Sequence, residues 1–519
     1  MSILKWSRKM ARLPTRHVYL ILVGVSLFSL GVYIITSHFY YQIGFPLDDA
    51  WIHQTYARNL VMYGEWSFVP GKPSAGSTGP LWSGILAFGF LFELSPYIWT
   101  FLLGWLFLSI TAIIAYRGFS YLYPESPERA LLSGCFIALE WHLVWAAGSG
   151  METTVFSAIT LAILVWLLGI WHRSEGHFQL KDKEPIRERM STWVGLGALA
   201  GISVWFRPDG ITLMGPIGLV VLLKKVEWKE KLRIAIILLV GFGSVFLPYL
   251  IFNRSFAGAW WPNTYYAKQA EYASLQELPY WLRLVTEFRL PLVGAGVILV
   301  PGFVYIVYKA IKKWNWGIIS GAGWMIGYIA VYAWRLPATY QHGRYLIPMM
   351  PGFFLWCMAG FFYFVGDETK NTWRRVFSRT WWTAWLVTTF IFWVIGARAY
   401  AEDVAVIESE MVTTARWISA NTEQEALVAA HDIGAIGYFS NRDLLDLAGL
   451  VSPQVIPFIS DENQLRRFLD EQGTNYLVTF PGWYPNLVSS ASMIYSTGAV
   501  FSPELGGENM AVFQWAHGR

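Results

Sequence analysis

Two adjacent carboxylates, Asp48 and Asp49, follow the first long apolar run of the chain, in the segment "PLDDAWIHQTYARNL" (46–60). Adjacent carboxylates repel each other, so the pKa of one should rise unless a cation neutralises the pair. A carboxylate held beside a hydroxyl group can act as a general base. The plainer interpretation is helix capping, with Asp48 as the cap and Asp49 favouring the dipole of a helix that starts at Ala50. We favour a chemical role for the pair, which capping does not exclude.

Positively charged and hydrogen-bonding side chains stand at the ends of later apolar runs. Lys268 closes the stretch "PNTYYAK", and "YQHGRY" contains His342, Arg344 and Tyr345. Arginine suits bidentate phosphate binding, and lysine neutralises phosphate as a point charge. Any single cation could instead reach lipid headgroups from the end of a membrane helix. The cluster of His, Arg and Tyr is more specific than one charge, so we expect it to bind phosphate.

Three other polar stretches allow two interpretations each. Glu152 in "GSGMETT" either interacts with a helix dipole or steers an acceptor and helps to hold a divalent cation. Arg207 and Asp209 flank Pro208, where a salt-bridged corner is slightly favoured over contact with substrate. The Gly-, Pro- and Ser-rich loop 70–82 is either a connector or a substrate contact. Glu152 and Arg207 therefore remain candidates for the substrate site.

The composition of the 519-residue chain is that of a polytopic membrane protein. Hydrophobic residues make up 55% of it and charged residues only 14%, whereas a soluble domain carries about a quarter charged residues. The net charge of +4 is small and the basic residues cluster in short loops, which argues against a nucleic-acid partner. Cys135 and Cys357 stand inside apolar runs, so we expect small buried hydrophobes, not a disulfide or metal ligands.

Eleven apolar stretches have about the length that crosses a bilayer, roughly 20 residues. The stretch 80–94 is shorter, starts with proline and contains two glycines, so we expect it to enter the membrane without crossing. On that assignment, loops on one side hold 24 Lys and Arg residues and loops on the other hold nine, the bias of the positive-inside rule. The expected spans are 18–39, 97–116, 130–147, 151–171, 192–206, 210–223, 234–252, 291–308, 316–334, 345–365 and 380–399.

This topology places the basic segment 1–17 inside, before an uncleaved anchor, and the C-terminus outside. The polar stretches described above then all face outward, so we expect chemistry at the outer surface of the cell membrane. From Ala401 onward the composition is that of a soluble domain, in which short buried strands alternate with amphipathic helices. We expect residues 1–400 to form the membrane domain and residues 401–519 a small outer α/β domain.

The order and common side of these motifs resemble the GT-C superfamily of membrane glycosyltransferases. The resemblance is strongest to the branch that includes the mycobacterial terminal arabinofuranosyltransferase. It is weaker to protein mannosyltransferases and to the aminoarabinose transferase of lipid A. The matching stretches are "DDAWIHQTYARNL…STGPLW", "SGMET", "RPDG", "PNTYYAK" and "HGRYLIP".

The resemblance implies a GT-C-like fold, a sugar donor linked to polyprenyl phosphate, and transfer with inversion to a hydroxyl of a glycan, lipid or protein. It carries the catalytic carboxylate of the family over to Asp48 or Asp49, of which we prefer Asp48. The leaving phosphate needs cations, a role that we expect for Arg344 with support from His342 and Lys268. We expect modest or no metal dependence, although the outer acidic residues could hold a divalent cation.

Three alternatives remain beside this interpretation. A transporter would carry charged residues near the bilayer midplane and interrupted helices in paired halves. The charges here stand at the ends of spans, and the sequence has no two-half symmetry. The second alternative is a ligase or polymerase that moves a whole lipid-linked glycan. A receptor or scaffold with an outer domain is a weaker third.

Overall fold

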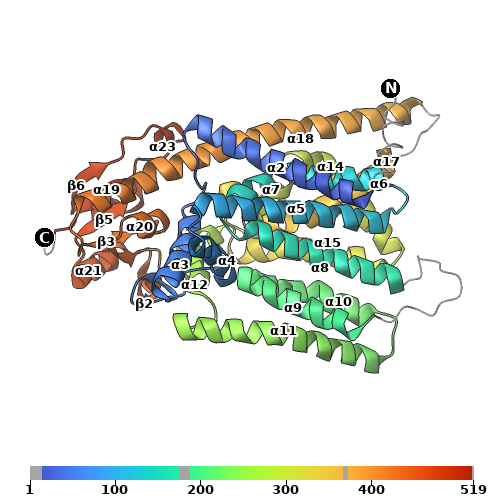
Figure 1. Ribbon diagram of the computed structural model, residues 1–519, viewed down its shortest axis with the longest axis horizontal. Coiled ribbons are helices and arrows are strands. Elements are labelled where there is room, and N and C mark those ends of the chain that lie inside the picture. The colour runs from blue at the N-terminus through green and yellow to red at the C-terminus, as the bar shows by residue number, and fades with distance from the viewer. Residues whose placement is uncertain (1–13, 175–187, 366–371, 517–519) are drawn as a thin grey trace.

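The computed structural model describes residues 14–174, 188–365 and 372–516, and it consists of a helical bundle with a small α/β domain at one end (Figure 1). The long helices run along the long axis of the molecule. Their sequences are apolar, and in an apolar medium without water a helix pairs the backbone N–H and C=O groups within the segment. The bundle contains α2 (Thr15–Tyr40), α5 (Pro96–Leu122), α6 (Pro127–Leu139), α7 (Trp141–Gly148), α8 (Thr153–Ser174), α9 (Met190–Phe206), α10 (Met214–Leu223), α11 (Trp228–Ala257), α14 (Ala295–Lys312), α15 (Trp316–Arg335), α17 (Met350–Val365) and α18 (Thr372–Val406).

Within the described ranges, seven helices are long and apolar enough to cross a membrane, and the bent pair α6 and α7 makes an eighth if it counts as one span. These eight coincide with eight of the expected spans. The other three expected spans fall on α9, α10 and the middle of α18, so a total of eleven stays a prediction. Helix α4 (Pro80–Leu91) has 12 residues, about 18 Å of helix, which is too short to cross about 30 Å of hydrocarbon.

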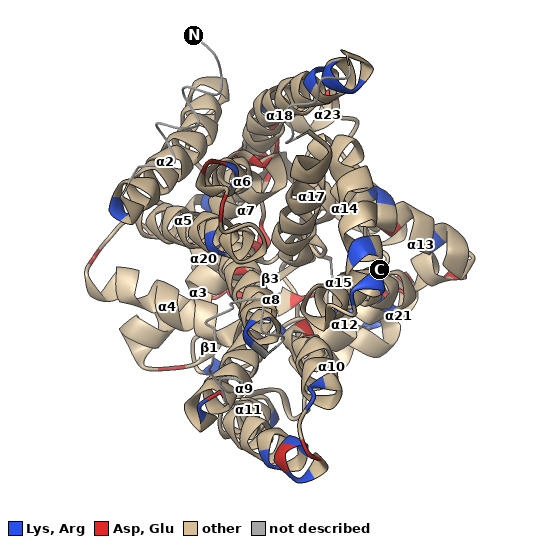
Figure 2. Ribbon diagram, turned by 90° about the vertical axis from the view of Figure 1, so that its right-hand side faces the viewer, with Lys and Arg blue, Asp and Glu red and all other residues tan. Residues whose placement is uncertain are grey.

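The two ends of the bundle differ in charge. Figure 2 looks at the end that faces away from the α/β domain, where Lys and Arg residues gather at the ends of α11, α14 and α18. This polarity agrees with the expected orientation, which stays a prediction. The segments 1–17, 172–191 and 366–379, on which the orientation partly depends, extend outside the described residues.

The opposite end of the bundle carries short elements that lie between the long helices and the α/β domain (Figure 1). The sharp turns here follow from Gly- and Pro-rich sequence, such as the loop before Pro80. These elements are α3 (Asp49–Tyr63), β1 (Ser67–Val69), β2 (Lys72–Pro73), α4, η1 (Pro208–Leu213), α12 (Asn263–Glu271), α13 (Tyr280–Arg289) and α16 (Tyr340–Gly343).

The C-terminal region forms the expected small α/β sheet structure, and the boundary at residue 401 stays a prediction. Its five-stranded sheet has the order β4-β3-β5-β7-β6, in which β3 pairs parallel with β4 and β5, and β7 pairs antiparallel with β5 and β6. Helix α18 continues past residue 401 and leads through η5 (Ile407–Val412) into this domain. Its elements are α19 (Thr413–Asn421), β3 (Leu427–Ala430), α20 (Gly434–Phe439), β4 (Asp443–Asp446), α21 (Glu462–Gln472), β5 (Tyr476–Thr479), η7 (Pro481–Trp483), β6 (Ser492–Ser496) and β7 (Ala511–Gln514).

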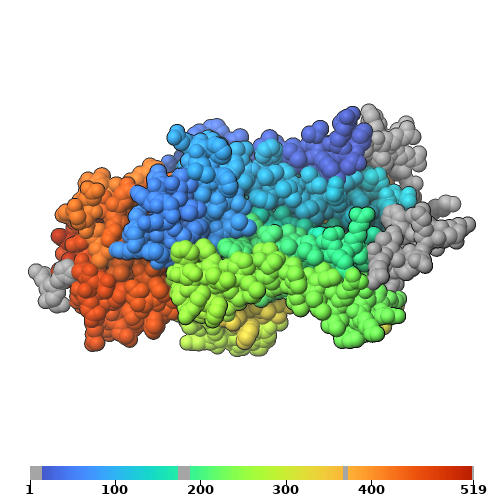
Figure 3. Space-filling view, turned by 60° about the horizontal axis from the view of Figure 1, so that its bottom comes forward, coloured from blue at the N-terminus to red at the C-terminus, as the bar shows by residue number. Residues whose placement is uncertain are grey.

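The α/β domain and the bundle share one apolar core. Trp51 of α3 packs against Tyr438 and Phe439 of α20, with ring centroids 4.8 and 4.6 Å apart. Ile433 and Ile436 belong to the same cluster of buried apolar side chains as the bundle helices. Figure 3 shows the domain in direct contact with the segment that contains α3 and α4. Burial of each large side chain contributes about 1.5–3 kcal/mol, which holds the domain on the end of the bundle.

Candidate active site

Asp48 lies at the junction between the bundle and the α/β domain. Its side chain makes no capping hydrogen bond to α3, so the capping interpretation is wrong. Its carboxylate oxygens instead accept hydrogen bonds from the backbone N–H groups of Gly434, at 2.6 Å, and Ala435, at 2.8 Å. These N–H groups start α20, where helical N–H groups lack partners within the helix. A Cβ on Gly434 would lie 2.0 Å from the Asp48 carbonyl oxygen, so glycine is required there.

The two adjacent carboxylates have opposite ionisation behaviour. Burial raises the pKa of Asp48 to about 8, and the nearby Asp432 carboxylate adds to this rise, which the two N–H groups of α20 offset only in part. Burial alone would also raise the pKa of Asp49, but Lys268 and Arg344 hold that pKa well below its usual range. The pair therefore combines a carboxyl group that exchanges its proton near neutral pH with one that stays ionised.

Asp49 is the centre of a basic cluster. Its Oδ2 lies 2.6 Å from Nη2 of Arg344 and 3.4 Å from Nζ of Lys268. The Tyr345 hydroxyl accepts a hydrogen bond from each of these cations, both at 3.1 Å. Among the described residues this hydroxyl has no acceptor for its own proton, which it can donate to a ligand. The structure thus brings together three of the residues expected to bind phosphate, beside one of the two expected catalytic carboxylates.

Two nitrogens of the Arg344 guanidinium, which carry three N–H groups, lack partners among the described residues. Its side chain is only 7% exposed, yet Nε and Nη1 have no hydrogen-bond partner among the described residues. Leaving a buried donor unpaired costs about 1–3 kcal/mol, and more for a charged group. The preceding Gln341, His342 and Gly343 all have left-handed backbones, with φ of 54°, 57° and 67°. Such a conformation is uncommon outside glycine and concentrates at functional sites.

His342 does not join the basic cluster in this structure, and its expected supporting role stays a prediction. Its Nε2 lies 2.8 Å from Asp403, a carboxylate that also accepts a hydrogen bond of 2.8 Å from Nε1 of Trp145. Its ring packs against Trp141 and Trp145, with centroids 5.4 and 5.1 Å away. The left-handed turn points His342 and Arg344 in different directions, which sequence spacing does not reveal.

Glu152 belongs to a second polar network beside the basic cluster. Its carboxylate lies 3.3 Å from Nε2 of His53 and 3.4 Å from Nη1 of Arg207. It therefore faces a histidine and an arginine, not Asp48. Across the described parts of the chain, no group of three or more potential metal ligands comes together. We missed His53 in the sequence, although it lies four residues after Asp49 and thus on the same face of a helix.

The expected salt bridge between Arg207 and Asp209 is present at 3.2 Å. Tyr332 donates a hydrogen bond of 2.8 Å to Asp209, and Tyr328 also donates to this carboxylate. Nη2 of Arg207 in turn donates to the Tyr332 hydroxyl at 2.9 Å. The corner after α9 is thus a buried, well-paired network.

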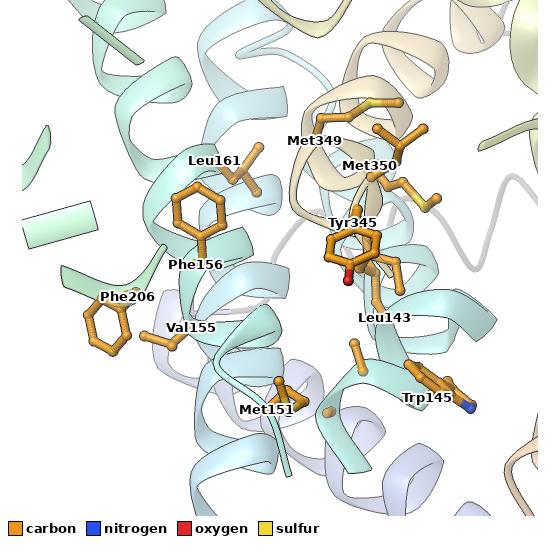
Figure 4. Packing of buried hydrophobic residues seen from close by; sticks show 14 of the residues in the cluster. Leu143, Trp145, Met151, Val155, Phe156, Leu161, Phe206, Tyr345, Met349 and Met350 are labelled. Atoms are coloured by element: carbon orange, nitrogen blue, oxygen red, sulfur yellow. The ribbon is translucent and has the colours of Figure 1, made fainter. Parts of the chain in front are cut away.

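Tyr345 connects the two networks. The guanidinium groups of Arg207 and Arg344 lie 5.6 and 5.0 Å from the centre of its ring, and Nζ of Lys268 lies 5.6 Å away. Each distance is within the range of a cation–π interaction. Figure 4 shows the Tyr345 ring beside the apolar side chains of Leu143, Met349 and Met350. Three cations therefore surround one aromatic ring on an apolar background.

Two cavities meet at this cluster. The first, of about 290 Å³, is mainly apolar, and Trp261 and Tyr265 contribute to its lining together with Glu152 and Arg207. The second, of about 650 Å³, lies between the bundle and the α/β domain and is lined by both carboxylates of the adjacent pair. Lys268 and Arg344 line both cavities. A lipid-linked group in the first cavity and a polar molecule in the second would meet at these two cations.

The fold of the chain is that of GT-C glycosyltransferases. It is similar to the apo oligosaccharyltransferase of Archaeoglobus fulgidus, with a TM-score of 0.61 over 89% of this chain and 69% of that one, at 11% identity. It is also similar to ArnT from Cupriavidus metallidurans bound to undecaprenyl phosphate, with a TM-score of 0.59 over 95% and 97% of the two chains, at 14% identity. For the arabinofuranosyltransferase AftD from mycobacteria the TM-score is 0.52, over 98% of this chain and 40% of that one, at 12% identity.

Sequence comparison adds one match. Residues 397–513 match a family described as a domain of unknown function, DUF8728. No curated protein matches the chain by sequence. The structural likeness extends to three kinds of GT-C protein and does not single out the arabinofuranosyltransferase branch. At such low identity a common structure establishes the fold, and the activity depends on the chemistry of the site.

Proposed function

We propose that the protein is a glycosyltransferase that moves a sugar from a polyprenyl-phosphate donor to a hydroxyl acceptor. The observation that carries this proposal is the position of Arg344, where an apolar cavity meets a polar one. It is a buried guanidinium whose Nε and Nη1 are unpartnered among the described residues. A lipid phosphate needs apolar walls beside cations. Two structural neighbours were solved with lipids of this chemistry, undecaprenyl phosphate in ArnT and a dolichol phosphate in the archaeal oligosaccharyltransferase.

The transfer requires one proton acceptor and a set of cations. The acceptor oxygen attacks the anomeric carbon, Asp48 takes the hydroxyl proton, and the bond from the anomeric carbon to the phosphate oxygen breaks. Attack and departure on opposite faces of the sugar invert its configuration. The bonding electrons move to the phosphate, where Arg344 and Lys268 neutralise the growing charge. Tyr345 donates its free hydroxyl proton to the same group as a hydrogen bond.

The two carboxylates suit different roles. A base works best when its pKa is close to the operating pH, and the pKa of Asp48 is about 8. Each Asp48 oxygen keeps a second acceptor position beside its bond to α20. Asp49 stays ionised, so we assign it to holding Arg344 and Lys268 in place. Glu152 and Arg207 border the apolar cavity, and we assign them to the donor side of the site.

The outer surface of the cell membrane is the proposed place of transfer. The polar cavity lies at the end of the bundle that carries the α/β domain, away from the basic helix ends (Figure 2). The partners are then the lipid-linked donor, membrane lipids and an acceptor in a glycan, lipid or protein. Within the GT-C fold, the motifs favour the arabinofuranosyltransferase branch.

Incubating the purified protein with radiolabelled polyprenyl-phosphate sugars, one at a time, tests the proposal. Label should leave one donor class and appear in a transfer or hydrolysis product. Asp48→Asn should lower turnover about 10²–10⁴-fold and keep donor binding. Because asparagine presents only one acceptor oxygen to α20, thermal unfolding is measured in parallel.

The outcomes separate the roles within the pair. If Asp49→Asn is inactive and Asp48→Asn is active, the roles are exchanged and the mechanism stands. Normal turnover in both variants, or no consumption of any donor by the wild-type protein, would refute glycosyl transfer at this site.

A further inference from the structure

The α/β domain turns the carboxyl ends of its parallel strands toward the polar cavity. His431 and Asp432 follow β3, Phe480–Trp483 follows β5, and residues of both segments line the cavity. From β3 the chain continues to β4 on one side, whereas β5 pairs with the other side of β3. The order of strands therefore reverses between β3 and β5. In open α/β sheets, ligands bind outside the carboxyl ends of the strands at such a point.

Trp483 presents an open aromatic face in this crevice. It is 50% exposed although it lines a cavity. The rings of His431 and Phe480 each lie 5.1 Å from it and fix its position. The N–H group of Gly482 donates to Glu508 at 2.6 Å and holds the loop. A rigid indole face offers apolar surface to the C–H groups of a sugar ring.

Hydrogen-bond acceptors line the same cavity as this indole. Oδ2 of Asp432 is buried and has no partner within the described part of the chain. The neighbouring His431 is held on both nitrogens, at 2.7 Å from the Tyr484 hydroxyl and 3.6 Å from Glu271 of α12. An unpaired buried acceptor costs about 1–3 kcal/mol, which a hydroxyl donor of a ligand relieves.

The acidic lining of the polar cavity disfavours anionic ligands. Of the described residues, the basic ones that line it are His431, Lys268 and Arg344, and the last two are paired with Asp49. The wall of the α/β domain therefore carries an excess of negative charge, which repels anionic ligands. Six carboxylates line the cavity: Asp48, Asp49, Glu271, Asp403, Asp432 and Glu508.

We propose that the crevice between the carboxyl ends of β3 and β5 binds a saccharide, and that the acceptor is therefore a neutral or amine-bearing glycan. Trp483 stacks on a sugar ring and Asp432 accepts from its hydroxyl groups. The glycan extends from there to Asp48, which lines the same cavity. Its role as acceptor rests on the proposed function, whereas saccharide binding needs no donor and is measured independently.

An array of immobilised pentose and hexose oligosaccharides, in neutral, amino-substituted and acidic forms, tests this proposal with the full chain in detergent. Binding to a subset of neutral or amino glycans is expected. Trp483→Ala should weaken it about tenfold, Trp483→Phe should retain most of it, and Asp432→Asn should also weaken it. Trp281→Ala is the matched control, because Trp281 is 65% exposed on α13 and does not line the cavity.

Three results would overturn the proposal: no glycan binding, a preference for acidic glycans, or equal binding by wild type and Trp483→Ala. Tethered peptides on the same array that bind where glycans do not would also overturn it and assign a peptide acceptor. Arg344→Ala should keep glycan binding while donor binding falls. Glycan binding without any transfer would refute the proposed function alone, and transfer without glycan binding would refute only the inference.

Discussion

Replacing Gly434 by alanine should separate the α/β domain from the candidate base. The added Cβ would lie 2.0 Å from the Asp48 carbonyl oxygen and 2.7 Å from its Oδ2, whereas ordinary contacts are 3.4–4 Å. The first of these neighbours is backbone at the start of α3 and cannot rotate away. Helix α20 must therefore move by more than 1 Å. Such a shift breaks the hydrogen bonds of 2.6 and 2.8 Å to the carboxylate.

The loss of these bonds has a structural and a chemical consequence. Hydrogen bonds to a charged group contribute about 1.5–3 kcal/mol each, less here because Asp48 borders an open cavity, so stability should fall. The α20 N–H groups also lower the pKa of Asp48, so without them that pKa rises above about 8. Only the ionised base accepts a proton, so the rate increases as pH rises through this pKa. The inflection of the rate should therefore move to more alkaline pH in Gly434→Ala.

Two measurements distinguish these effects: donor consumption as a function of pH, and thermal unfolding. The pH range is about 6 to 10, which brackets the Asp48 pKa of about 8. Gly84→Ala is the matched control, because a Cβ at that helical position would meet no described atom within 4 Å apart from its chain neighbours and the backbone of its own helix. A Gly434→Ala protein with normal rate and normal pH profile would refute the coupling between α20 and Asp48. A less stable variant with an unmoved inflection would make the contact structural and remove the base role from Asp48.

Three further predictions concern the donor, the topology and metals. Arg344→Ala should weaken binding of undecaprenyl phosphate by about 2–4 kcal/mol. The control Lys72→Ala, at an exposed side chain, should not weaken it. Equal binding by wild type and Arg344→Ala would indicate that Arg344 contacts lipid headgroups and not the donor phosphate. Alkaline phosphatase fused after Tyr400 should be active, and an inactive fusion with an active cytoplasmic reporter at the same point would overturn the orientation. EDTA should reduce activity modestly or not at all, and complete loss restored by Mg²⁺, Mn²⁺ or Ca²⁺ would contradict this expectation.

Hydropathy and strand patterns are sufficient to predict the fold class. A continuous apolar run long enough to cross a bilayer is expected to form a helix there. Short buried strands that alternate with amphipathic helices form an α/β domain. The short α4 follows from the same length argument. The number of spans does not follow from hydropathy alone, because α9 and α10 are short and α18 continues from the bundle into the domain. Local sequence does not mark where such a helix leaves the membrane.

The basic part of the site was predictable from residue types, because cationic side chains at the ends of apolar runs were expected to bind one phosphate group. Lys268, Arg344 and Tyr345 meet at Asp49, although Lys268 and Asp49 are 219 residues apart in the chain. The direction of His342 was not predictable, because a left-handed backbone at a non-glycine residue has no simple sequence signal. The partner of Asp48 was not predictable either, because it depends on how the α/β domain docks.

The adjacent carboxylates contact two different parts of the molecule. Successive residues at the start of a helix point about 100° apart, so Asp48 and Asp49 cannot face the same partner. Asp48 contacts α20 and lines the polar cavity, whereas Asp49 contacts Arg344, which lines both cavities. A single carboxylate could not pair with Arg344 and Lys268, the cations proposed to bind the donor phosphate, and also remain free to accept a proton. Two neighbours at one helix start can do both, which gives a physical reason for the pair.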